Sequence, residues 1–103
     1  MAKKYRLEYL PLFERELADT VDYIAKTLQN PIAAERLTDD TEKAILERLK
    51  APASFQKYNS IKDRKNPYYT IYVKNYTVFY VVIDDVMEVR RFVYGKRDIE
   101  KIV

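Results

Sequence analysis

The chain has 103 residues, of which 48% are hydrophobic and 34% charged, and its net charge is +3, as in a single globular domain spanning residues 1–103. Because cysteine and histidine are both absent, the sequence excludes disulfides, the usual zinc ligands and a Ser-His-Asp triad, and we expect no metal and no cofactor. The sequence shows no cysteine, no apolar run near the roughly 18 to 20 residues of a membrane span and no signal-peptide cleavage pattern, so we expect a cytoplasmic protein.

A strand and a first helix are predicted at the start of the chain. Residues 5–10 alternate apolar and polar side chains, which is the period of a strand with one buried face. Pro11 suits the first turn of a helix, and from Phe13 to Leu28 apolar residues recur every three or four positions. This spacing predicts one apolar stripe of an amphipathic helix.

A second helix is predicted to follow almost without a loop. Asn30 and Pro31 have the residue types of an N-cap and a first helical position, and Pro52 ends the pattern. The two helices would therefore form an αα-hairpin. Its outer faces carry acidic residues that we expect to form a solvated surface, namely Asp19, Asp22, Glu35, Asp39, Asp40 and Glu42.

The second half of the chain predicts an antiparallel three-stranded meander. After a long connection over residues 51–66, Val, Ile, Tyr and Phe dominate residues 68–73, 76–83 and 86–94. The breaks between these segments are short and polar, as two-residue hairpin loops should be. Residues 96–103 would add a short C-terminal tail.

The order β-α-α-β-β-β predicts an α+β fold of two layers, in which the αα-hairpin packs on the apolar face of an antiparallel sheet. Most of the ten tyrosines fall on the strands, where cross-strand pairing explains them better than stacking on nucleic-acid bases. The core is expected to be built from apolar residues on the inner faces, namely Phe13, Leu17, Val21, Ile24, Leu37, Ile45, Ile71, Val78, Val82 and Val89.

Charge is unevenly distributed along the chain. Residues 1–50 contain nine Lys and Arg against ten Asp and Glu, a net −1, whereas residues 51–103 contain ten against six, a net +4. A basic C-terminal half suits a polyanionic partner, either nucleic acid or an acidic protein segment, and it is also ordinary for a small domain. Charge alone leaves both interpretations open.

Four segments resemble the RelE/ParE superfamily of toxins, in an order and spacing that cover almost the whole chain. They are Asp22–Ala25, Asn30–Ala34, Asn75–Tyr80 and Val89–Asp98. The resemblance implies the toxin of a bacterial type II toxin-antitoxin system, a class that includes plasmid-stabilisation modules. Such a toxin blocks growth until a cognate antitoxin covers it, and an acidic or amphipathic antitoxin segment is expected to fold onto the sheet and the basic face.

The resemblance leaves three functions open. RelE-like members cleave messenger RNA in the ribosomal decoding site, whereas ParE-like members inhibit DNA gyrase by binding. The long, nearly loopless helical hairpin resembles the ParE-like branch more closely, and this favours gyrase inhibition. The third alternative is a non-toxic domain of the same fold that only binds a partner protein.

RelE-like cleavage needs groups that deprotonate a ribose hydroxyl, stabilise the phosphate and protonate the leaving oxygen, and Lys, Arg and Tyr supply them in that branch. Arg97 matches the arginine that follows Gly-Lys in such toxins. The two lysine positions, however, correspond to about Thr70 and Tyr72, and the arginine of the next strand to about Thr77. The terminal tyrosine falls near Val103, so three kinds of expected catalytic group are missing.

A different catalytic constellation would use Arg97 and Arg91 with Tyr94 or Tyr72. As neighbours on one strand, Arg90 and Arg91 are expected to point to opposite faces of the sheet, so that at most one lies beneath the helices. Other basic residues are candidates for contacts with the target or the antitoxin, and a solvated loop explains those in the long connection equally well. These candidates are Lys57, Lys62, Arg64, Lys65, Arg90 and Lys96.

Overall fold

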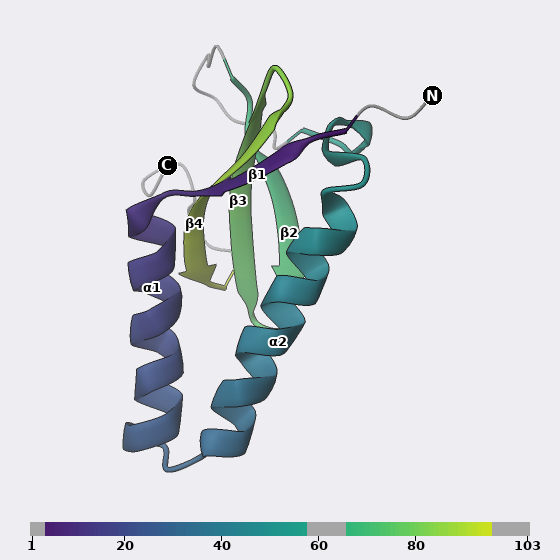
Figure 1. The fold of residues 1–103 in the computed structure, drawn as a ribbon. Coiled ribbons are helices and arrows are strands. Elements are labelled where there is room, and N and C mark those ends of the chain that lie inside the picture. Colours follow the sequence, from purple (N-terminus) through teal and green to yellow (C-terminus); the bar gives the residue numbers. More distant parts are fainter. Residues whose placement is uncertain (1–3, 58–65, 96–103) are drawn as a thin grey trace.

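The computed structural model describes residues 4–57 and 66–95. Their order confirms the predicted β-α-α-β-β-β arrangement and the α+β class (Figure 1). The predicted tail over residues 96–103 lies outside the described residues. The elements are β1 (Arg6–Tyr9), α1 (Pro11–Asp22), the π-helical turn η1 (Tyr23–Thr27), α2 (Pro31–Arg48), the 3-10 turn η2 (Pro52–Ser54), β2 (Tyr69–Val73), β3 (Tyr76–Ile83) and β4 (Val86–Tyr94).

The sheet has four strands in the order β1-β4-β3-β2. The pairs β2/β3 and β3/β4 are antiparallel, which confirms the predicted meander. The first strand joins the outer side of β4 in a parallel pair, with Arg6 opposite Val86. The sheet is therefore mixed, because β1 and β4 are parallel. The chain between these two strands includes both helices as well as β2 and β3.

The two hairpin loops require left-handed backbone conformations. Lys74 and Asp84 have φ angles of 54° and 55°. This conformation brings Cβ close to the following carbonyl and costs roughly 1 to 2 kcal/mol per residue. The tight two-residue turns nevertheless fix which residues pair between β2 and β3 and between β3 and β4.

The reversal between the helices is as short as predicted. The side chain of Asn30 accepts a hydrogen bond from the backbone N–H of Ala33 at 3.1 Å, and Pro31 occupies the first turn of α2. The first helix, by contrast, is regular only to Asp22, and it then widens into η1. Gln29, with a φ of 51°, completes the reversal.

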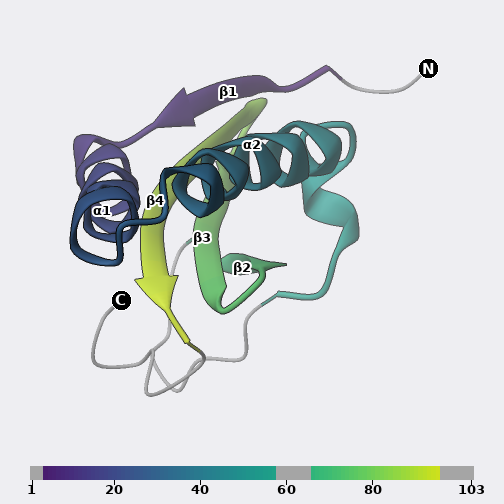
Figure 2. The ribbon, with the colours of Figure 1, turned by 90° about the horizontal axis from the view of Figure 1, so that it is seen from below.

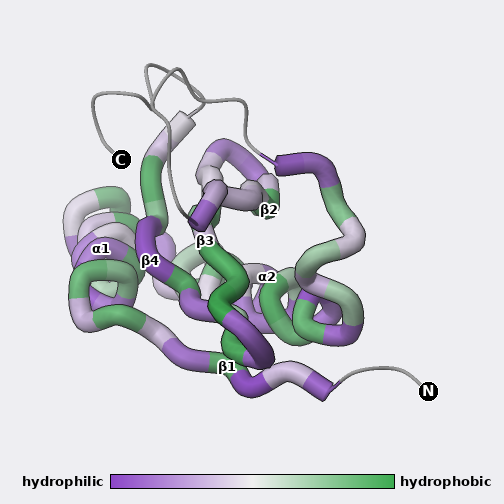
Figure 3. Tube along the Cα trace, turned by 90° about the horizontal axis from the view of Figure 1, so that it is seen from above, coloured by the Kyte–Doolittle hydropathy of each residue, from purple (hydrophilic) through white to green (hydrophobic). Residues whose placement is uncertain are grey.

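The helices cover one face of a strongly twisted sheet, with α1 alongside β4 and α2 across β3 and β2 (Figure 2). Hydrophobic residues run along the length of β3, at the centre of the sheet (Figure 3). Of the predicted core residues, Leu17, Ile24 and Val82 lie half-buried at its margin and Val21 lies outside the cluster. The buried cluster consists of Phe13, Leu37, Ile45, Tyr69, Ile71, Val73, Val78, Tyr80, Met87, Val89 and Phe92.

A half-buried arginine network joins the end of α2 to the sheet. Arg48 Nη1 donates to the backbone oxygen of Thr70 at 3.0 Å and to the Tyr80 hydroxyl at 2.9 Å. That hydroxyl donates in turn to the backbone oxygen of Pro52 at 2.8 Å, and burial raises the pKa of Tyr80. The Arg48 guanidinium also lies 3.6 Å from the ring centre of Phe55. These contacts fix the direction in which the chain leaves the helix.

Candidate functional site

The face of the sheet turned away from the helices, called here the far face, carries the positions that catalysis would need on β2 and β3. Thr70, Tyr72 and Thr77 lie on it, because they alternate with the core residues of their strands. Tyr72 is 56% exposed, whereas Thr77 is fully buried and its hydroxyl donates to the backbone oxygen of Gly95 at 2.9 Å. Tyr68, Phe79 and Val81 form a second buried apolar cluster on the same face.

The two adjacent arginines lie at a bulge in β4. Phe79 pairs with Arg91 and Tyr80 with Val89, so Arg90 is an extra residue in the register. Val89 and Phe92 both belong to the helix-side core although they are three positions apart. Arg90 and Arg91 therefore both point away from that core, and the expectation of opposite faces is wrong because it assumed a regular strand.

Arg91 is held by a carboxylate from α1. Its Nε donates to Glu16 Oε1 at 3.0 Å, and its Nη2 donates to Oε2 at 2.7 Å. Glu16 Oε1 also accepts a hydrogen bond from the backbone N–H of Phe92 at 3.0 Å. This N–H lies on the edge of β4 beyond the end of β1, so Glu16 supplies the acceptor that no strand provides there. The hydrogen bond to Glu16 raises the pKa of Arg91. This bidentate pair joins α1 to the sheet.

Arg90 also has partners within the fold. Its Nε donates to Glu88 Oε1 at 2.9 Å, and its guanidinium lies 5.8 Å from the ring centre of Tyr68. The side chains of both members of the ion pair are less than one-third exposed. The arginine thus covers the apolar cluster of the far face, and only part of its side chain is open to a partner.

The other candidates lie apart from one another. Tyr94 is 59% exposed and pairs in register with Tyr76 on the helix side, so it points to the face opposite that of Tyr72. Lys57 is exposed in the connection after α2. The remaining candidates lie outside the described residues, and these are Lys62, Arg64, Lys65, Lys96 and Arg97.

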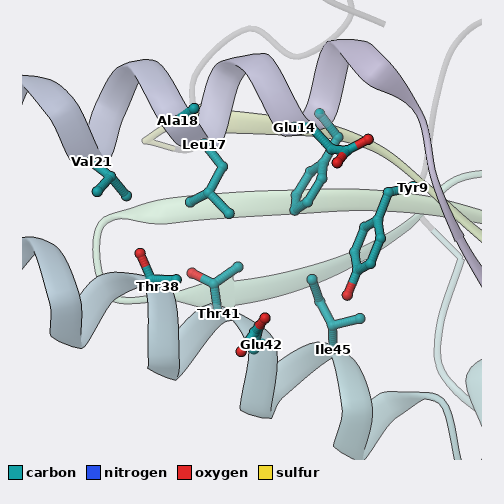
Figure 4. Close-up of a pocket in the computed structure, with 10 residues that line it drawn as sticks. Tyr9, Glu14, Leu17, Ala18, Val21, Thr38, Thr41, Glu42 and Ile45 are labelled. Atoms are coloured by element: carbon teal, nitrogen blue, oxygen red, sulfur yellow. The ribbon is translucent and has the colours of Figure 1, made fainter.

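An apolar groove runs between the two helices (Figure 4) and encloses about 290 Å³. Phe13, Leu17 and Val21 of α1 form one wall, and Thr41 and Ile45 stand opposite on α2. Thr41 is fully buried, and its hydroxyl finds no hydrogen-bond partner within the described part of the chain. Sequence periodicity did not predict this groove, because it depends on how far apart the two helices lie.

The rim of the groove is polar and acidic. Tyr9, Glu14, Thr38 and Glu42 line it, and Figure 4 shows the Tyr9 hydroxyl reaching across the groove towards α2. Burial, followed by the charges of Glu42 and Glu14, raises the pKa of Tyr9. Glu42 is exposed, as expected for the solvated surface. It also lies at the rim of the groove, whose apolar walls and acidic rim would fit an apolar segment with basic flanks.

The described residues 4–57 and 66–95 contain no group of three or more acidic side chains placed to hold a metal ion. Neither helix in this part of the chain is long and apolar enough to cross a membrane.

Comparison with known proteins identifies one family and several solved structures of similar fold. Residues 7–99 match the family described as ParE toxin of type II toxin-antitoxin system, parDE. A chain of the chromosomal ParDE TA system from P. aeruginosa aligns with a TM-score of 0.69 and 13% identity, over 89% of this chain and 97% of that chain. YafQ from E. coli strain BL21(DE3) aligns with a TM-score of 0.50 and 12% identity, over 88% and 93%. Among curated proteins no sequence matches this chain.

Proposed function

Because the chain belongs to the ParE toxin family of type II toxin-antitoxin systems, we propose that it arrests growth by binding DNA gyrase and not by cleaving messenger RNA. Membership of the family makes it the toxin of such a pair, and its partner is a cognate antitoxin. Gyrase and ribosomes both work in the bacterial cytoplasm, so the proposal places the toxin there.

The proposal depends mainly on the engagement of Arg91. Cleavage of an RNA strand requires cations and hydroxyls that are free to meet the phosphate and the ribose. Arg91 instead donates to both oxygens of Glu16, and the Thr77 hydroxyl donates to a backbone carbonyl. Neither group is available without breaking a contact that holds the fold, and this favours inhibition by binding.

We assign the contacts with gyrase to basic and aromatic residues on the connection after α2, on the far face, at the end of β4 and on the chain that follows it. Arg97 has the central place among them, because its position after Gly95 and Lys96 matches the arginine that RelE-like members of the same superfamily carry. Tyr72 and Tyr94 are exposed and present aromatic surface on opposite faces of the sheet. The further residues proposed for target or antitoxin contacts are Lys57, Lys62, Arg64, Lys65, Arg90 and Lys96.

The antitoxin is proposed to occupy the groove between the helices. An apolar floor with an acidic rim fits one face of an amphipathic helix whose flanking residues are basic. An antitoxin helix seated there would lie close to α1 and α2 while another segment covers the sheet.

A bulky charge in the groove is expected to separate neutralisation from toxicity. Ala18 is exposed and lines the groove, so Ala18→Arg should leave the core intact. We expect the variant to bind antitoxin at least about tenfold more weakly, since a steric clash in an interface core costs more than about 1.4 kcal/mol. Growth arrest should then persist despite antitoxin co-expression.

The control for Ala18→Arg is Leu46→Arg, which adds the same charge to an exposed position of α2 outside the groove. Antitoxin affinity is measured by calorimetry for both variants. Equal affinities for the two would contradict the assignment of the groove to the antitoxin.

The target is tested by assaying one preparation of the purified toxin against DNA gyrase and against programmed ribosomes. We expect it to inhibit plasmid supercoiling by DNA gyrase, and we expect added antitoxin to restore the activity. Programmed ribosomes treated in parallel should keep their messenger RNA intact when it is read by primer extension. Messenger cleavage without gyrase inhibition would make Arg97, with Arg91 and the nearby tyrosines, catalytic candidates instead. A folded protein inactive in both assays would be a non-toxic binding domain.

A further inference from the structure

A pocket walled by three tyrosines, called here the tyrosine pocket, opens where η1 meets the ends of β3 and β4. Tyr23, Tyr76 and Tyr94 line it together with Asp19, Thr20, Ile24 and Leu28, and it encloses about 570 Å³. It shares no lining residue with the groove between the helices. The pocket is therefore a separate surface at the opposite end of α1 from Tyr9.

The rings of the tyrosine pocket are held by stacking on the core. Tyr76 stacks on Phe92 with ring centres 4.8 Å apart and an interplanar angle of 18°. Tyr94 meets Tyr76 nearly at right angles, at 5.5 Å and 73°. Tyr23 and Tyr94 are 55% and 59% exposed, so their rings remain open to a ligand while Tyr76 forms a fixed wall. Burial and then the neighbouring phenols of Tyr94 and Tyr23 raise the pKa of Tyr76.

Tyr23, the third ring of the pocket, is positioned by η1, the π-helical turn that follows α1. At the end of η1 the backbone N–H of Leu28 donates to the backbone oxygen of Tyr23 at 3.1 Å, and the backbone N–H of Asn30 donates to the backbone oxygen of Ile24 at 3.0 Å. This wider turn rotates the chain relative to α1, and such π-helical insertions in helices occur frequently at functional sites. The left-handed conformation of Gln29, with a φ of 51°, follows this turn directly.

The charge of the tyrosine pocket is negative. Among the described residues that line it, Asp19 is the single charged side chain. Two lysines of the described residues have acidic partners outside the pocket lining. Lys26 pairs with Asp22 at 3.0 Å, and Lys74, which lines an adjoining pocket shared with Tyr94, pairs with Asp40 at 3.3 Å. Within the described part of the chain, the Asp19 carboxylate therefore lies beside several aromatic faces with no cationic side chain in the pocket lining.

We propose that the tyrosine pocket binds an arginine side chain of a partner protein, with the guanidinium against the tyrosine rings and paired with Asp19. A flat guanidinium stacks on aromatic faces and pairs with a carboxylate in one plane, which an ammonium group does less well. The fold uses the same kind of contact internally, where Arg48 lies 3.6 Å from the ring centre of Phe55. The site does not depend on which enzyme the toxin inhibits.

The test uses N-acetyl-arginine amide as the probe and N-acetyl-citrulline amide, its neutral isostere, as the matched ligand. Each is titrated into the purified protein while the tyrosine ring signals are followed by nuclear magnetic resonance. We expect saturable shifts of Tyr23, Tyr76 and Tyr94 with the arginine probe, at a Kd on the order of 1 to 10 mM, and none with citrulline. Equal shifts with both ligands, or no saturable shift with arginine, would overturn the proposal.

Two exposed positions test the contacts without disturbing the core. Asp19→Asn is expected to weaken the arginine probe about threefold, as for an exposed ion pair, and Tyr23→Ala about twofold to fivefold. Tyr72→Ala is the control, since Tyr72 is 56% exposed, like Tyr23, but lies outside the pocket. An unchanged Kd in both pocket variants, or an equal loss in Tyr72→Ala, would count against the assignment.

Discussion

Phe13→Ala is expected to lower the free energy of unfolding by about 3 to 5 kcal/mol, the usual cost of removing a buried phenylalanine. Phe13 is only 2% exposed. Its ring stacks on Tyr9 at 5.3 Å and meets Phe92 edge-on at 6.2 Å, so one side chain joins β1, α1 and β4. Since small domains are stable by only about 5 to 15 kcal/mol, this loss is a large fraction of the total.

Urea denaturation of the purified variant measures this effect. Leu12→Ala, at the adjacent position of α1, is the control, because Leu12 is 42% exposed and should cost less than about 1 kcal/mol. A change below about 1 kcal/mol for Phe13→Ala would show that the side chain is not the centre of the core. Loss of growth arrest in this variant would reflect unfolding and would say nothing about the target.

Glu16→Ala is expected to cost about 2 to 4 kcal/mol. The substitution removes the acceptor for Arg91 and for the backbone N–H of Phe92, and it leaves both donors half-buried beside α1. The side chains of Glu16 and Arg91 are each 21% exposed, so solvent replaces the lost contacts only in part. Glu14→Ala, at an exposed position of the same helix, should be nearly neutral for stability.

A double-mutant cycle separates the ion pair from other effects of Glu16→Ala. Arg91→Ala alone should also destabilise the protein, and the double variant should cost less than the two single changes together, by at least about 1 kcal/mol. Additive costs would mean that the pair contributes no coupling. In that case Glu16 would not hold Arg91 in place, and the main support for inhibition by binding would be lost.

Much of the fold was predictable because it depends on local patterns. The run of β-branched and aromatic residues over 76–83, the apolar repeat that begins at Phe13 and the cap at Asn30 are each specified by neighbouring residues, and the structure has all three elements there. Such patterns fix the type of an element and the face that it buries. They do not fix its partners in the sheet, so the parallel pairing of β1 with β4 was not predicted.

The functional surfaces were less predictable because they combine distant residues. Glu16 and Arg91 are 75 positions apart, and no periodicity links them. The bulge at Arg90 follows from the register between β3 and β4, which neither strand specifies alone. The groove and the tyrosine pocket likewise take their walls from two or more elements. Asp19 and Glu42 had been assigned only to a solvated surface, although each lines one of these pockets.

The arrangement of cations supports the proposal that this member of the family inhibits by binding and not by cleavage. Arg90 and Arg91 both contact carboxylates within the fold, at 2.9 Å and 2.7 Å. The positions on β2 and β3 that would need lysine and arginine carry Thr70, Tyr72 and Thr77. A toxin that binds its target needs only exposed surface, and the connection after α2 and the far face provide it through Lys57 and Tyr72.

The most direct measurement is a titration of plasmid supercoiling by DNA gyrase against increasing amounts of the purified toxin. The proposed function predicts that inhibition saturates once the toxin occupies its sites on gyrase and that one equivalent of antitoxin per toxin reverses it. Supercoiling that continues unchanged at a large excess of folded toxin, together with repeated messenger cleavage on programmed ribosomes, would contradict it.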